Sequence, residues 1–472
     1  MGLIVAYRPN FSNRCRRLSL LASVLLWGSV SAAANPTSSP TFHAQTLDTE
    51  LQTVAANHNI PALAYGVFFA DQEPHIRYRG ATSATPFRWG SITKTVTALT
   101  LLRLAEVQQI ELLTPLADLL PNNTDAALWQ NPWAAQQPIR LLHLLELTAG
   151  LPELSRLEFD YPEPLTLSAA LQLAPAQRTT RWPPGQHHSY SNLTPALSQM
   201  LIEKLSKLDY ASAVQRYMVE PLQMRDVFFT PRADLPGGFR RDGQTPIPYW
   251  HMVYPAFGAM NAPLEALLQL AMSLTRGELL TATQRRHLFQ THTTLAAREG
   301  FNFDYAAGLY PRFRQNLTWW GHGGDADGYR ARLSVLPEFN AGYVVVINTD
   351  NIDALRAMER ILERHMAASL PRGVTPACEP TVGQVSKPLV GTYKQVTRRF
   401  GDPQGTVTLS FDGQYLYHQR NARRTQLCRV AGNLWRRARD PGPSVGIGGQ
   451  MDWWQGRTGV TCALRHAWLL SS

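Results

Sequence analysis

Hydrophobic positions repeat along this chain with two periods. In several segments apolar residues recur every three or four positions, which is the spacing of one face of an α-helix. The longest run follows Gly90 and includes Val96, Leu99 and Leu102. The periodicity predicts helices over residues 47–58, 91–109, part of 137–150, 195–204, 262–275 and 353–365. Short apolar segments bounded by turn residues predict strands over residues 63–69, 75–79, 304–310, 318–321, 330–336 and 343–348.

The order of these elements indicates the fold class. Within residues 35–370, predicted strands lie towards both ends and predicted helices occupy the middle. This order predicts an α/β (α+β) fold in which an antiparallel sheet is flanked by helices, with a helical subdomain. Residues 371–387 are rich in Pro and Gly and are interpreted as a linker. Residues 388–472 are expected to form a small all-β barrel domain with predicted strands at 406–411, 415–420, 425–430, 434–437, 449–454 and 461–468.

The first 34 residues have the pattern of a secretory signal peptide. Basic residues ending at Arg17 precede an apolar run over residues 18–30, and the small residues that a cleavage site needs follow at residues 31–34. The apolar run is shorter than a membrane-spanning helix requires, although an uncleaved anchor is the alternative. We therefore expect an exported protein, periplasmic or secreted.

The net charge of +10 is unevenly distributed. The signal segment contributes four arginines and no acid, and residues 388–472 hold eleven arginines, one lysine and four aspartates, a net charge of +8. The remaining residues therefore carry a net charge of only −2. The sequence has no zinc-ligand spacing, aromatic RNA-binding signature or long basic helix, so nucleic acid is not an expected partner. The basic C-terminal domain is expected to contact the rest of the chain or an anionic part of the cell envelope.

Three cysteines follow the signal segment: Cys378, Cys428 and Cys462. Export permits disulfide formation, and three cysteines allow at most one bridge within a monomer. Cys428 and Cys462 both lie in predicted strands, so we predict that they pair, with the other two pairings left open.

Ser91-Ile92-Thr93-Lys94 opens the longest apolar helix and is the first candidate for chemistry. In a first helical turn, unpaired backbone N–H groups and the positive end of the helix dipole favour a developing oxyanion. Lys94 follows Ser91 by three residues, so both side chains share one face of the helix. A serine hydroxyl becomes a good nucleophile when a nearby base accepts its proton, and a desolvated lysine can act as that base or tune it.

Two further motifs follow in order along the chain. Tyr190-Ser191-Asn192 comes after a Pro-Gly turn, and Trp320-Gly321-His322-Gly323-Gly324-Asp325 precedes an apolar strand. With flanking segments at residues 139–145, 148–152 and 220–224, the three motifs resemble the serine β-lactamase and penicillin-binding protein superfamily. The resemblance is to its class C β-lactamase-like branch of D,D-peptidases, D-aminopeptidases and esterases, and it extends from about residue 45 to residue 368. Leu389-Val390-Gly391-Thr392-Tyr393 and the strands after it are similar to the lipocalin-like extension of that branch.

The resemblance implies that Ser91 is the acylated nucleophile, that Lys94 is its partner, and that Tyr190 acts with the lysine as general base. A phenol with an ordinary pKa of about 10 needs an adjacent cation to become a phenolate at neutral pH, and Lys94 would supply it. Taken alone, Tyr190 would be interpreted as a half-buried core residue. The resemblance implies no metal and no cofactor, and His143 and the pair at 187–188 are interpreted as structural because they lack metal-ligand spacing to acids or cysteines.

The resemblance also implies a substrate-binding group. Asn192 would bind a substrate amide, and the N–H groups of Ser91 and Asp325 would form the oxyanion hole. Gly323 and Gly324 would permit close backbone approach on an edge strand. Without the resemblance, Asn192 would be interpreted as a helix cap and the two glycines as part of a turn.

His322 stands where β-lactamases and peptidases of the superfamily carry the lysine of a Lys-Thr-Gly motif. A lysine holds a substrate carboxylate with a permanent charge, whereas a histidine with an ordinary pKa of about 6.5 is mostly neutral at pH 7. This difference favours an exported serine hydrolase that acts on an ester, an amide or a D-amino-acid-containing peptide. The alternatives are a weak β-lactamase or D,D-carboxypeptidase, and a penicillin-binding sensor that acylates without turnover.

Overall fold

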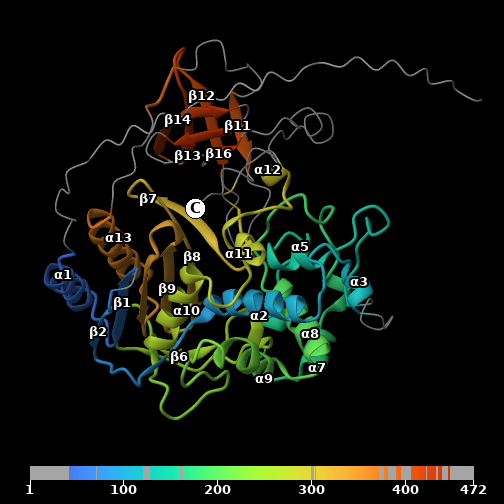
Figure 1. Cartoon of the computed structure of the whole chain (residues 1–472), viewed down its shortest axis with the longest axis horizontal. Coiled ribbons are helices and arrows are strands. Elements are labelled where there is room, and N and C mark those ends of the chain that lie inside the picture. Colours follow the sequence, from blue (N-terminus) through green and yellow to red (C-terminus); the bar gives the residue numbers. More distant parts are fainter. Residues whose placement is uncertain are drawn as a thin grey trace, which may run out of the picture. The chain divides into compact units, whose positions relative to one another are not determined.

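The computed structural model describes residues 42–70, 72–120, 128–159, 161, 163–298, 302, 304–370, 377–380, 390–394, 406–420, 422–431, 434–437 and 445–446 (Figure 1). The predicted signal peptide, residues 1–34, lies outside the described residues. Within the described ranges, no helix combines the length and apolarity needed to cross a membrane.

A six-stranded antiparallel sheet forms the centre of residues 42–370, as predicted (Figure 1). Its strands, in spatial order, are β2 (His75–Arg79), β1 (Leu63–Phe69), β10 (Ala341–Ile347), β9 (Tyr329–Leu336), β8 (Leu317–Ala326) and β7 (Tyr310–Arg314). β1 and β10 are far apart in sequence but pair over their whole length, from Leu63 with Ile347 to Phe69 with Ala341. This pairing joins the N-terminal hairpin of β1 and β2 to the strands that follow the helical middle of the chain, and β2 and β7 form the two edges of the sheet.

Helices cover both faces of this sheet, because alternate residues of a strand point to opposite sides. Tyr65 and Val67 of β1 pack in one apolar cluster with α1 (Ala44–Asn57) and α13 (Ile352–Ala368). Ala64 and Phe68 belong to the larger cluster on the other face. That cluster includes α2 (Thr93–Val107), α8 (Leu193–Ser206) and α10 (Leu264–Arg276).

The remaining elements of residues 42–370 are short. The helices are α3 (Leu116–Leu119), α5 (Leu141–Leu145), α6 (Arg156–Phe159), α7 (Leu167–Leu171), α9 (Tyr210–Val214), α11 (Ala282–Phe289) and α12 (Leu295–Arg298). Single turns of tighter or wider helix are η1 (Gly90–Ile92), η2 (Pro175–Gln177), η3 (Gln215–Val219), η4 (Pro255–Phe257) and η5 (Pro337–Phe339). Two small ribbons pair β3 (Pro86–Arg88) with β6 (Asn261–Pro263) and β4 (Gly238–Phe239) with β5 (Pro246–Ile247). The pairing of β3 with β6 fixes the chain immediately before Ser91.

Two predicted elements differ from the structure. Residues 304–309 form no strand, because a turn in which the Ala306 N–H donates to the Leu309 carbonyl, with Gly308 at φ +85°, precedes β7. The predicted strand at 318–321 is part of β8, which continues to Ala326 through glycines that would ordinarily weaken a strand. Val107, the last residue of α2, is 60% exposed.

Residues 391–446 contain a second six-stranded sheet in sequential order, which agrees with the predicted meander (Figure 1). Its strands are β11 (Gly391–Lys394), β12 (Thr406–Phe411), β13 (Leu416–Arg420), β14 (Arg423–Ala431), β15 (Leu434–Arg437) and β16 (Val445–Gly446). Among the described residues, no pairing joins β16 back to β11, so closure into a barrel stays a prediction. The predicted strands at 449–454 and 461–468 lie outside the described residues.

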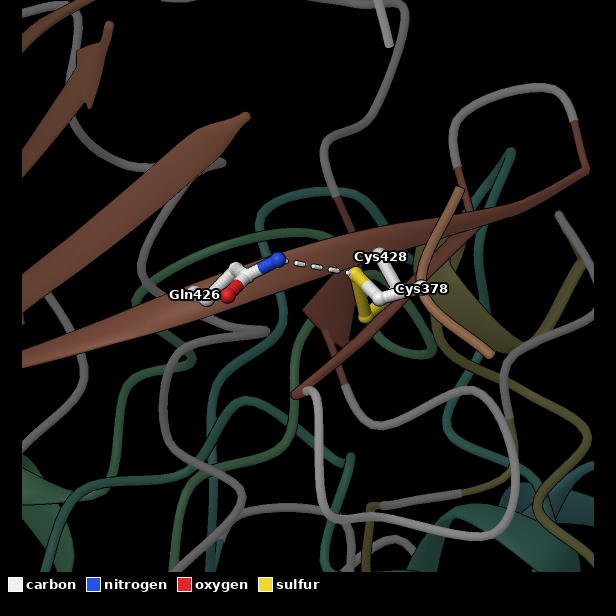
Figure 2. Close-up of a disulfide and its surroundings, with 3 residues drawn as sticks. All are labelled: Cys378, Gln426 and Cys428. Carbon is white, nitrogen blue, oxygen red and sulfur yellow. Dashed lines mark hydrogen bonds between the residues drawn. A yellow bond between two sulfur atoms is a disulfide. The ribbon is translucent and has the colours of Figure 1, made fainter. Parts of the chain in front are cut away.

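A disulfide joins Cys378 to Cys428, and the predicted pairing of Cys428 with Cys462 is wrong (Figure 2). The two cysteines are 50 residues apart, and their Cα atoms lie 5.1 Å from each other. The side-chain amide of Gln426 on the same strand donates to the Cys378 sulfur at 3.3 Å. The disulfide therefore links the predicted linker segment to β14. The sequence pattern of the strands does not predict a contact between residues this far apart in the chain.

Candidate active site

Ser91 lies on the η1 turn, which packs directly against β8. Gly90 has φ +51°, and a Cβ there would lie 2.6 Å from the backbone nitrogen of Asp325. A Cβ on Gly324 would lie only 1.7 Å from the carbonyl oxygen of Trp89. The two glycines therefore allow the backbone that carries Ser91 to approach the backbone of Asp325, which the oxyanion-hole prediction requires.

Lys94 and Ser91 meet as their spacing predicts. Lys94 is 2% exposed, and its Nζ donates to Ser91 Oγ at 3.0 Å and to the Phe257 carbonyl at 2.7 Å. The Lys94 amine is thus buried and hydrogen-bonded to the Ser91 hydroxyl oxygen. At this distance it can take the hydroxyl proton or stabilise its removal.

Tyr190 lies beside Lys94, on the segment just before α8. The Lys94 Nζ is 4.9 Å from the centre of the Tyr190 ring. The ring centre lies 6.2 Å from that of His322 and 6.4 Å from that of Tyr310. The structure therefore brings Ser91, Lys94, Tyr190 and His322 into one locality.

A cluster of aromatic rings that the sequence did not indicate surrounds His322. Tyr305 meets His322 edge-on with ring centres 5.7 Å apart, and Tyr310 lies 5.7 Å from the same ring. His188 stacks on Tyr305 at 5.8 Å, and burial lowers the pKa of His188 to about 4. His322 itself is buried, and its Nδ1 lies 2.6 Å from the Gly323 carbonyl oxygen. The His322 ring therefore lies within a cluster of tyrosine rings that includes Tyr190.

Asn192 stands at the N-cap position of α8, but its side chain does not cap the helix. Ser191 Oγ accepts the bond from the Leu193 N–H, at 3.1 Å. The Asn192 N–H and Nδ2 instead donate to the two carboxylate oxygens of Glu153, at 2.7 and 3.3 Å. The helix-cap alternative is therefore wrong, and Glu153, which sequence reasoning missed, fixes Asn192 beside the cavity that Ser91 lines.

β8 is an edge strand only in its second half. Its pairing with β7 ends where Tyr310 meets Gly321, and among the described residues no strand pairs with 322–326 on that side. Gly324 faces the Ser91 turn, whereas a Cβ on Gly323 would meet the Arg332 guanidinium at 2.3 Å, so a side chain at either position would displace a neighbour.

A cavity of about 480 Å³ opens on Ser91. Asn192 and Asp325 also line it, whereas His322, Gly323 and Gly324 are not among its lining residues. The rest of the lining is Phe159, Tyr161, Tyr249, Trp250, His251, Met252, Phe257, Gly258, Ala326, Asp327, Arg330 and Asp350. None of the aromatic residues in this lining was singled out from the sequence.

Of the histidines interpreted as structural, His143 and His187 are buried and His188 is half-buried. The Arg140 N–H donates to His143 Nδ1 at 3.1 Å at the start of α5, and burial lowers the pKa of His143 and of His187 to about 4. Across the described ranges, no group of three or more His, Cys, Asp or Glu side chains is arranged to hold a metal ion.

Comparison with known proteins agrees with this fold and geometry. The family model described as Beta-lactamase matches residues 47–367. Protein flp of Staphylococcus aureus (strain MW2) is 23% identical over 282 residues, which cover 57% of this chain and 54% of that protein. The chain thus spans about half the length of this curated relative.

Two solved structures show the same fold. The D-stereospecific amidohydrolase from Streptomyces sp. superimposes with a TM-score of 0.55 at 20% identity, covering 67% of this chain and 97% of that one. The beta-lactamase/D-alanine carboxypeptidase from Yersinia pestis gives a TM-score of 0.56 at 22% identity, covering 70% and 98%. With a family model that matches more than half of its length, this chain belongs to the beta-lactamase family.

Proposed function

We propose that this chain is an exported hydrolase of the class C β-lactamase-like branch that forms an acyl-enzyme at Ser91. Its substrate would be an ester, an amide or a D-amino-acid-containing peptide. The observation that carries the proposal is the Lys94 amine, 3.0 Å from Ser91 Oγ and 4.9 Å from the Tyr190 ring. Export is supported by the signal-peptide pattern of the first 34 residues.

The proposed reaction has two halves. Lys94 and Tyr190 together remove the Ser91 proton while Oγ attacks the substrate carbonyl, and the resulting oxyanion accepts bonds from the N–H groups of Ser91 and Asp325. The carbonyl re-forms as the bond to the leaving group breaks, and the leaving group takes the proton. Water, activated by Tyr190, then attacks the acyl-enzyme and releases the acid and free Ser91.

The residues around the nucleophile favour a substrate without an obligatory carboxylate. His322 replaces the lysine of related enzymes and is buried among tyrosine rings, so no permanent cation is provided at that position. The similarity to a D-stereospecific amidohydrolase supports an amide of D configuration. The similarity to a beta-lactamase/D-alanine carboxypeptidase supports the alternative, a weak β-lactamase or D,D-carboxypeptidase.

Pre-steady-state kinetics with a chromogenic ester test this proposal. A burst followed by steady turnover is the expected result, because a hydrolase forms and clears its acyl-enzyme. A single stoichiometric burst without turnover would instead identify a penicillin-binding sensor. Competition by penicillin at the same serine, with release slower than for the ester, would be the result for a weak β-lactamase.

We also propose that the C-terminal sheet belongs to a lipocalin-like domain that contacts an anionic component of the cell envelope. The support is its charge, since residues 388–472 carry +8.

A further inference from the structure

The cavity that opens on Ser91 combines two kinds of side chain. Part of its lining is aromatic: Phe159, Tyr161, Tyr249 and Trp250. Another part carries three carboxylates and one guanidinium: Asp325, Asp327, Asp350 and Arg330. We infer that this cavity binds a substrate that carries an organic cation, a protonated or quaternary amine on an apolar body. The inference rests on the proposed function, because it concerns what the Ser91 site hydrolyses.

The aromatic part of the lining is accessible to solvent. Phe159 is 38% exposed, although it is a large apolar side chain. Its ring centre lies 4.9 Å from that of Trp250, and the Trp250 indole N–H donates to the Phe159 carbonyl at 3.2 Å. The two rings therefore present a fixed aromatic surface beside the nucleophile.

A buried ion pair supports this surface from the protein side. Glu158, next to Phe159, pairs with Arg178 at 2.7 Å, and both side chains are 1% exposed. The Tyr254 hydroxyl lies 2.8 Å from the same Glu158 oxygen, and Tyr254 shares a segment with Trp250. Breaking a buried pair is costly, so the segments that carry the two rings are preorganised rather than free to collapse onto each other.

The carboxylates are not equally compensated. Asp325 pairs with Arg330 at 2.7 Å, and Asp350 accepts a bond from the Gly328 N–H at 3.0 Å. Asp327, in the turn between β8 and β9, has neither a hydrogen bond nor an ion pair within the described part of the chain. Asp327 is therefore the carboxylate that a substrate cation can neutralise.

The Asp327 side chain is exposed, and, among the described residues, the arginines near it act on its charge without forming an ion pair with it. Burial and the neighbouring Asp350 raise its pKa, while Arg88, Arg330 and Arg240 act in the opposite direction. Arg88 is buried under the Tyr249 ring, 4.0 Å from its centre, and donates to the Trp250 carbonyl. Its positive charge acts on Asp327 only through space.

The chemistry of the lining favours an organic cation over a metal ion. Among the described residues, no carboxylate group has the arrangement of a metal site. Aromatic faces attract ammonium groups through their quadrupole and cover the apolar body that carries the charge. A cation that lies between these rings and Asp327 would bring a nearby ester or amide carbonyl to Ser91.

Matched ester pairs test this inference on the full-length protein. One pair is p-nitrophenyl trimethylammoniobutanoate and its uncharged isostere with carbon in place of nitrogen, so the charge lies in the acyl part. The other is acetylthiocholine and its carbon isostere, with the charge in the leaving group. We expect kcat/KM to favour the cation by about tenfold in at least one pair. The preference should shrink by about threefold in Asp327→Asn and in Trp250→Leu. It should stay unchanged in Asp118→Asn, an exposed carboxylate on α3 outside the lining.

The outcomes separate this inference from the proposed function. Hydrolysis of both members of each pair at equal rates would overturn the cation preference and leave the Ser91 hydrolase intact. A preference that persists unchanged in the folded Asp327→Asn protein would overturn the assignment to this cavity. Failure to hydrolyse any of the four esters, together with no covalent labelling of Ser91, would remove the proposed function and this inference with it.

Discussion

His322 is the residue that separates this site from lysine-bearing relatives. Its ring is buried against Tyr190, Tyr305 and Tyr310, so it contributes to the packing around the proposed base. A lysine at this position would add a permanent charge at the end of a longer and more flexible side chain. We therefore expect this one side chain to influence substrate preference while the Ser91–Lys94 geometry stays the same.

Substitution His322→Lys should raise the rate of acylation by penicillins relative to neutral esters by about tenfold, because a fixed cation returns for the carboxylate. The ratio of acylation rates for one penicillin and one neutral ester measures this effect, with the wild-type protein as the reference. An unchanged or inverted ratio would show that residue 322 does not face the carboxylate end of the substrate.

Asp304 gives a pH dependence of stability. It is buried, accepts a bond from Thr294 Oγ1 at 2.9 Å, and burial together with the nearby Glu146 raises its pKa from 3.8 to about 7. Between these values the folded protein holds a proton that the unfolded chain has released, so the free energy of unfolding should fall as pH rises towards 7. Urea unfolding at about pH 5 and about pH 7.5 should show this loss in wild type and a flatter profile in Asp304→Asn. Equal slopes in the two proteins would show that Asp304 is not the group responsible.

At the scale of elements, the site depends on the contact between the Ser91 turn and β8. Gly324 faces the Trp89 carbonyl, and any side chain there must move one backbone away from the other. Gly324→Ala should therefore lower the free energy of unfolding by about 1–3 kcal/mol and leave the protein folded. Its kcat should nevertheless fall, because the oxyanion site is displaced in the folded protein. Gly237→Ala is the matched control, because a Cβ there meets nothing within 4 Å. Full activity in folded Gly324→Ala would contradict the role of this contact.

Elements with simple patterns were predictable from the sequence. β1 and β2 match their predicted bounds, because each is an apolar or alternating segment between clear turns. β8 was predicted too short, since its glycines are unfavourable in a strand unless close packing requires them. The partner of Cys428 was predicted wrongly, because it depends on where the chain returns after 50 residues.

Some residues of the candidate site were likewise predictable from the sequence, and others were not. Ser91 and Lys94 meet because the η1 turn leads directly into α2, so that three residues of helical backbone bring their side chains together. The motif order indicated that Tyr190 and His322 belong to the same site. Glu153 under Asn192 and the Phe159–Trp250 ring pair could not be predicted, because each is a contact between side chains brought together only by the tertiary fold.

At the scale of the whole molecule, residues 42–370 contain both large apolar clusters and every candidate site residue. A chain that ends after residue 370 should therefore unfold cooperatively and hydrolyse a small ester at the wild-type rate. The C-terminal region has its own sheet, with a disulfide that closes a 50-residue loop. Its removal should abolish co-sedimentation with anionic vesicles, and in the full-length protein that binding should weaken as salt screens charges beyond about 8 Å.

Melting temperature, ester turnover and vesicle co-sedimentation at two salt concentrations measure these effects for the truncated and full-length proteins. Equal co-sedimentation of both would contradict the envelope contact. Failure of the truncated chain to fold would show that the C-terminal sheet is part of the main core.

The proposed mechanism requires Ser91 to carry a covalent acyl group during turnover. Its most direct test is intact-protein mass spectrometry, with peptide mapping, after incubation with a fluorophosphonate and separately after rapid quenching of an ester reaction. We expect one adduct per chain, on Ser91, in the wild-type protein, and none in Ser91→Ala, which should fold normally because only one hydroxyl is lost. A stoichiometric adduct on another residue of the Ser91→Ala protein would show that Ser91 is not the nucleophile.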